Sequence, residues 1–183
     1  MIAKAFCAVL LMAQAAMAAE YCTLPTEQVM ALPAILAGDW QMVMRGGIGV
    51  VDGTPAAMPT DDAPEQATFV ADGGDVTLEQ DDFFPTTRLT HVVIAETVQP
   101  DLALPGESPL NALELLDPEL RETGLSCDPG TLPQFAGEVA MDGGAASTLR
   151  LYAFGPEMMV LVIKGESGHQ AARAVFDLKR AAR

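Results

Sequence analysis

The chain has little positive charge and few aromatic side chains. Its 183 residues include 10 Lys and Arg against 25 Asp and Glu, giving a formal net charge of −15, and only 5% are aromatic. Because a surface this acidic repels nucleic acids and anionic lipids, we expect neither as a partner. Long apolar runs are also missing, since the longest beyond the N-terminus, Met158–Ile163, is far shorter than the ~18 residues of a membrane helix. We therefore expect no stable insertion into a membrane.

Residues for catalysis and metal binding are equally sparse. The chain has two histidines, His91 and His169, and no serine in a Gly-x-Ser-x-Gly turn. His91 and Glu96 form the one pair of polar side chains that we would consider as the active site of an enzyme. Acidic pairs occur without a calcium-loop pattern, and the methionines favour core filling over Cu(I) binding. We predict no enzyme, no metal and no cofactor.

The first 18 residues have the three parts of a secretory signal peptide. Lys4 supplies the positive start, Phe6–Met12 forms a short apolar run, and Ala16-Met17-Ala18 gives the small-x-small cleavage pattern. We predict cleavage near Ala18, which leaves residues 19–183 as a single domain in the periplasm or secreted.

Two of the three cysteines remain after this cleavage. Cys7 leaves with the signal peptide, whereas Cys22 and Cys127 stay in the mature chain. Because a lone pair of cysteines in an oxidising compartment usually joins, we predict a Cys22–Cys127 disulfide. Two free buried thiols are the alternative.

Most of the mature chain alternates short apolar runs with turn signals, which is typical of antiparallel β structure. Turns such as Asp72-Gly73-Gly74 and Asp142-Gly143-Gly144 supply the positive φ that tight hairpins need. We predict eight strands: Asp39–Arg45, Gln66–Ala71, Asp75–Gln80, Arg88–Thr97, Phe135–Met141, Ser147–Phe154, Met158–Glu166 and His169–Arg180.

Three segments depart from this pattern. Thr26–Leu36 reads as a short helix that Pro33 bends or ends. The proline-rich insertion at 99–130 carries a helical part at 108–124, whose leucines lie at helical spacing. We expect those leucines, Leu110, Leu113, Leu116 and Leu120, to cover the outer face of Met158–Lys164. Val50–Pro64, with three prolines and no periodicity, is predicted to be a long loop.

Strand alternation assigns the faces of the first and last strands. Trp40, Met42 and Met44 share one face of the first strand. In the last strand Phe176 shares its face with Arg180, which places a cation at the apolar end of that strand.

Gly38-Asp39-Trp40 opens the first strand just after a short helix, and about eight strands follow. With the cation ending the last strand, the chain resembles the lipocalin-like (calycin) β-barrels. The resemblance implies an eight-stranded antiparallel barrel with Trp40 at its closed end, beneath Arg180 or Lys179, and alternation favours Arg180. A β-sandwich with a covering helix is the alternative fold.

A barrel of eight strands is either filled by side chains or holds one small ligand. We predict that Met42, Met44, Phe69 and Phe176 line a hydrophobic pocket, while a solid core would use the same residues. The expected function is therefore an exported lipocalin-like protein that binds a small apolar molecule. The alternative is a periplasmic protein-binding module, for example a metalloprotease inhibitor, that works through Glu20–Leu24 or Val50–Pro64.

Overall fold

The computed structural model describes residues 21–60, 63–80, 85–92, 103–104, 114–125, 128–140 and 146–181. The expected signal peptide at 1–18, Glu96 and Cys127 lie outside these residues. So do the second half of the expected strand Arg88–Thr97 and the leucines Leu110 and Leu113.

Eight antiparallel strands close into a barrel, because the first strand pairs with the last. This closure confirms the predicted barrel and excludes the open sandwich. The short turns that follow β3 and β8 contain Gly73 and Gly168 at positive φ, as tight hairpins require. The barrel strands are β1 (Gly38–Val51), β3 (Glu65–Asp72), β4 (Asp75–Glu79), β5 (Thr87–His91), β6 (Gln134–Ala140), β7 (Ala146–Ala153), β8 (Met158–Ser167) and β9 (Gln170–Arg180).

The predicted loop at Val50–Pro64 is wrong in its first half. β1 runs on to Val51 and turns at Asp52-Gly53, both at positive φ, into a ninth strand, β2 (Thr54–Ala57), which pairs with β1. β1 therefore exchanges its partner on this side, pairing with β3 as far as Met42 and with β2 from Ile48. The loop was predicted because prolines usually interrupt strands. An edge strand such as β2 nevertheless tolerates Pro55, since it is paired on one side only.

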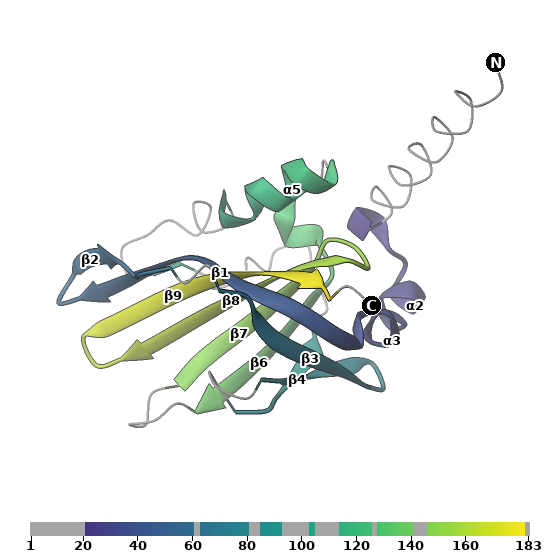
Figure 1. Cartoon of the computed structure of the whole chain (residues 1–183), viewed down its shortest axis with the longest axis horizontal. Coiled ribbons are helices and arrows are strands. Elements are labelled where there is room, and N and C mark those ends of the chain that lie inside the picture. The colour runs from purple at the N-terminus through teal and green to yellow at the C-terminus, as the bar shows by residue number, and fades with distance from the viewer. Residues whose placement is uncertain are drawn as a thin grey trace, which may run out of the picture.

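Two short helices lie across one end of the barrel, where the C-terminus also ends (Figure 1). They are α2 (Thr26–Val29) and α3 (Leu32–Leu36), preceded by a 3₁₀ turn, η1 (Tyr21–Thr23). The expected single helix is thus divided, and Pro33 lies in the first turn of α3 rather than ending a helix. This position suits proline, because the first turn needs no backbone N–H donor.

A second apolar layer covers the outside of β7, β8 and β9. It includes α5 (Asp117–Thr123), which lies over the outer face of the barrel in Figure 1 and ends at Gly124 in the left-handed conformation. Leu116 and Leu120 pack there against Val160 and Val162, as the leucine spacing predicted. The short 3₁₀ turns η2 (Glu114–Leu116) and η3 (Pro129–Thr131) flank α5. No helix within the described residues is long and apolar enough to cross a membrane.

Candidate ligand-binding site

The inward side chains of the barrel form one apolar cluster. Alternation places every second residue of each strand inside, and on β9 the inner face carries Phe176, as the sequence predicted. Leu161 and Leu178, for example, are fully buried. The cluster contains large side chains, among them Trp40, Phe69, Phe135, Leu151, Leu161 and Leu178, and it continues to Ile163 and Ala174 further along β8 and β9.

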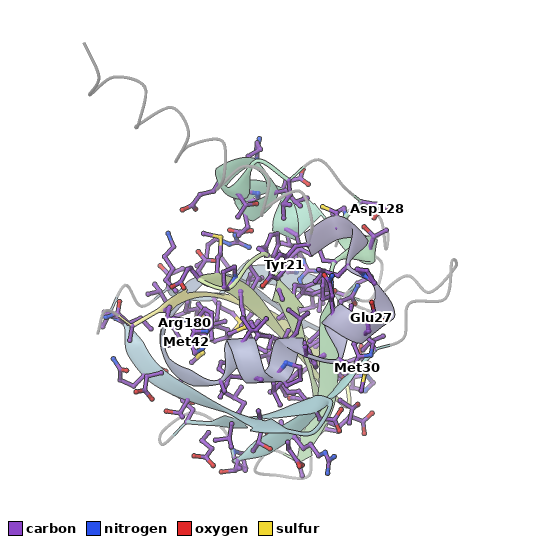
Figure 2. All side chains as sticks on the ribbon, turned by 90° about the vertical axis from the view of Figure 1, so that its right-hand side faces the viewer. Tyr21, Glu27, Met30, Met42, Asp128 and Arg180 are labelled. Atoms are coloured by element: carbon purple, nitrogen blue, oxygen red, sulfur yellow. The ribbon has the colours of Figure 1, made fainter. Side chains whose placement is uncertain are left out.

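Arg180 stacks on Trp40 at the helix-covered end, with its guanidinium carbon 4.5 Å from the indole centroid. Arg180 donates hydrogen bonds to the carbonyl oxygens of Ala37 and Pro156, each at 3.1 Å. The Trp40 indole N–H donates to the Leu36 carbonyl at 2.8 Å. The carbonyl groups at the end of α3 are thereby satisfied by two side chains of the barrel. Figure 2 looks onto this end and labels Arg180 beside the short helices.

The structure divides the four residues predicted to line a ligand pocket. Phe69 lies at the helix-covered end, where its ring packs edge-on against that of Trp40 with 6.2 Å between the ring centroids. Met42, two residues after Trp40 on the same face of β1, is fully buried. Met44 and Phe176 lie opposite each other on β1 and β9, nearer the other end. We call that other end, where the β1–β2 and β8–β9 turns lie, the distal end (Figure 1).

Methionines gather at the distal end over a glycine. A Cβ atom on Gly47 would lie 2.9 Å from Met44 Cε and 3.0 Å from Met58 Sδ. A bulge between Met44 and Gly46 turns Gly47 inward, and the backbone N–H of Met58 donates to the Gly47 carbonyl at 2.9 Å. Met44, Gly47, Met58 and Phe176 are called the distal wall below. Sequence reasoning missed Met58 because it placed this residue in a loop.

Small residues continue the inner face beyond the distal wall. Gly47 pairs with Ala174, and Gly49 pairs with Ala172, which in turn pairs with Gly165. A Cβ atom on Gly49 would meet only one atom, the Ala56 carbonyl oxygen at 4.0 Å. This side of the distal end is therefore lined by backbone and methyl groups and by the Ser147 hydroxyl over Gly165, with open space beside Gly49.

Next to the distal wall, the neighbouring strands β3 and β4 bring polar side chains to the distal end. Glu65 pairs with Met42 and so faces inward, and its Oε2 accepts a 2.6 Å hydrogen bond from the side-chain amide of Gln80. Gln80 and Thr87 are both buried. The sequence alternation of β3 carried this signal, because Glu65 lies two residues before the inward Ala67.

The pair His91 and Glu96 is not testable as an enzyme site, because Glu96 lies outside the described residues. The His91 ring packs against the Phe135 ring, with 5.8 Å between the ring centroids. Burial lowers the pKa of His91, and the nearby Asp75 carboxylate opposes this shift. The pKa of Asp75 is itself lowered by a hydrogen bond from Arg88. Within the described part of the chain, no three His, Cys, Asp or Glu side chains are placed to hold a metal ion.

An ion pair fastens α5 to the outside of the barrel. Arg45 bonds Glu119, which is only 4% exposed, and donates to the Leu115 carbonyl at 2.6 Å. The Nη1 atom of Arg45 also lies 3.4 Å from Oδ1 of Asp177. Burial lowers the pKa of Arg45 and raises that of Asp177. Cys22 is half-buried against the same outer layer, and its predicted pairing with Cys127 stays a prediction.

Two hollows lined by described residues lie outside the barrel core. One of about 560 Å³ lies between α3 and Arg180, and one of about 270 Å³ lies between the β1–β2 and β8–β9 turns. The second adjoins the distal end, since Val50 and Ala171 line it.

The chain matches no protein-family model, no curated protein and no solved structure in the three comparisons that were made.

Proposed function

We propose that the protein is an exported, lipocalin-like binder of a small apolar molecule, which it holds at the distal end of the barrel. The observation that carries the proposal is the distal wall, where Met44 and Met58 lie over Gly47. Methionine side chains are flexible and polarisable, so they adapt to an apolar guest by changing rotamer. Gly49 lies two residues further along β1, and there is open space beside it.

The division of the barrel supports this assignment. Bulky residues such as Trp40 and Phe69, together with the Arg180–Trp40 stack, close the helix-covered end, so we assign the ligand to the distal end. Export to the periplasm, a Cys22–Cys127 disulfide and lipocalin-like ancestry belong to the same proposal. They rest on the signal-peptide pattern, the cysteine pair and the Gly38-Asp39-Trp40 motif.

The test uses N-phenyl-1-naphthylamine, a neutral probe that fluoresces in apolar surroundings. Gly49→Leu adds a side chain where the structure has open space, so we expect it to weaken probe binding at least 10-fold. Gly46→Leu is the matched control, because Gly46 pairs with the outward Val175 and a Cβ there has no neighbour within 4 Å. Absence of probe binding to the unmodified protein, or equal effects of the two variants, would contradict the proposal.

A second test identifies the natural guest. Protein purified from its own host is examined by native mass spectrometry and then extracted with organic solvent. We expect a small molecule that leaves on extraction and whose mass accounts for the difference between the two spectra.

One observation favours the alternative, a protein-binding module. β2 is exposed along its length, pairs with β1 on one side and has no pairing strand on its other side among the described residues. Such an edge accepts an extended segment of another protein as an added strand. Recovery of a stoichiometric protein from periplasmic extract, lost in an Ala57→Lys variant of β2, would favour this function over ligand binding.

A further inference from the structure

The distal end is lined unequally, apolar on one side and acidic on the other. Glu65 and Met42 face each other across the pairing of β1 and β3, and Met44 follows two residues later on the same inner face. Opposed side chains on neighbouring strands lie within about 5.5 Å at Cβ, and diagonal ones within about 8 Å. The Glu65 carboxylate therefore lies beside the distal wall, at the point where β1 exchanges β3 for β2.

Among the described residues, Glu65 has a neutral hydrogen-bond partner and no cationic one. Its Oε2 accepts from Gln80, and the ion pairs of the described residues join other carboxylates, such as those of Asp75, Glu119 and Glu122. An ionised carboxylate accepts up to about four hydrogen bonds, so Glu65 retains capacity for donors beyond the one that the described residues supply. A half-buried carboxylate with one neutral partner is a favourable neighbour for a cation.

From this juxtaposition we propose that the ligand is a cationic amphiphile, with an amine head at Glu65 and an apolar tail on the distal wall. The inference rests on the proposed function and names its ligand class. An alkylammonium head brings N–H donors and a positive charge to Glu65, while its chain packs on Met44 and Phe176. The net charge of −15 adds a long-range attraction for cations. A fatty-acid carboxylate would instead place two negative charges side by side, so we expect such ligands to be excluded.

The experiment compares three ligands with the same ten-carbon tail but different heads: decylamine, decanol and decanoate. The whole gene is expressed with export to the periplasm, and the purified product is used. The affinity of each ligand is measured by its displacement of N-phenyl-1-naphthylamine from this protein. We expect decylamine to bind at least 10-fold more tightly than decanoate, with decanol between them. The preference should shrink as salt rises, because the interaction is electrostatic.

Glu65→Gln tests whether this one carboxylate sets the preference. We expect the variant to lose most of the discrimination between decylamine and decanoate, while the affinity for decanol and the probe stays unchanged. Glu79→Gln is the matched control: it removes the same charge from the exposed face of β4, and the preference should persist. Circular dichroism and thermal unfolding show that each variant is folded.

The outcomes separate the two proposals. If the probe does not bind to the unmodified protein, the proposed function fails, and this inference fails with it. If the probe binds but decanoate equals or exceeds decylamine, the inference is overturned while the proposed function stands. If Glu65→Gln and Glu79→Gln reduce the preference equally, overall charge rather than Glu65 is responsible, and the inference is again overturned.

Discussion

His91 shows how one side chain couples the folded barrel to pH. Its ring lies against Phe135 at the end of β5, and the backbone N–H of His91 donates to the Asp75 carboxylate at 3.2 Å. Burial lowers the pKa of His91 relative to that of the unfolded chain, which is about 6.5 for histidine. As pH falls through that value, the unfolded chain binds a proton before the folded protein does. Stability from His91 is thus complete above the unfolded pKa and is lost on acidification.

We therefore predict that His91→Gln reduces the fall in melting temperature between pH 7.5 and pH 5.5. Thermal unfolding followed by circular dichroism at several pH values measures this slope. His169→Gln is the control, since His169 is exposed at the β8–β9 turn, and it should leave the slope unchanged. A slope that is identical in unmodified protein and His91→Gln would refute the assignment.

At the scale of single elements, the attachment of α5 depends on the Arg45–Glu119 pair. Removing one member of a buried ion pair leaves the other charge uncompensated, so Arg45→Met should lower the free energy of unfolding by about 3 kcal/mol. Adding Glu119→Leu to Arg45→Met should restore part of that loss, because the orphaned carboxylate disappears as well. Urea unfolding of the single and double variants gives these values.

The control for this cycle lies on the same helix. Glu122 and Lys179 form a 3.1 Å ion pair whose side chains are 56% and 58% exposed. Replacing either with Gln should change stability by less than about 1 kcal/mol, because water screens exposed pairs. If the Arg45 and Glu119 substitutions are instead additive, the pair does not act as a unit.

The elements that could be predicted from the sequence are those whose hydrophobic period decides their placement. β8 is an example, because its two apolar faces, Met159–Leu161–Ile163 and Met158–Val160–Val162, indicated a strand covered on both sides. β2 could not be predicted in the same way, since Pro55 and three small neighbours carry no period. Asp52-Gly53 is a dipeptide typical of hairpin turns, but the prolines that follow it are typical of a loop, and the loop was predicted.

Only those residues of the candidate site that strand alternation places could be predicted from the sequence. Alternation placed Met44 and Phe176 on the inner faces, and local sequence is sufficient for that assignment. It did not bring Met58 or Glu65 to the same place, because their positions depend on a bulge after Met44 and on the exchange of strand partners along β1. Such pairings join residues that are distant in sequence, and a single sequence does not contain the register between them.

For the molecule as a whole, the predicted Cys22–Cys127 disulfide would join the start of the mature chain to the insertion that carries α5. Cys22 packs beside the outer layer formed by Leu116, Leu120 and their neighbours. The bond would close a loop of about 105 residues and stabilise the fold by up to about 4–5 kcal/mol on the chain-entropy model. It would therefore hold the outer layer against the barrel independently of the Arg45–Glu119 pair.

Titration of the denatured, unreduced protein with a thiol reagent should accordingly find no reactive cysteine. Cys22→Ser, Cys127→Ser and the double variant should lose similar amounts of stability, because each removes the same bond. Independent free thiols would behave differently: two would react, and the effects of the two single variants would add. If the disulfide forms, reduction should also loosen α5 first, so backbone amides of Leu120 and its neighbours should exchange with deuterium faster while those of the inner strand β8 stay protected.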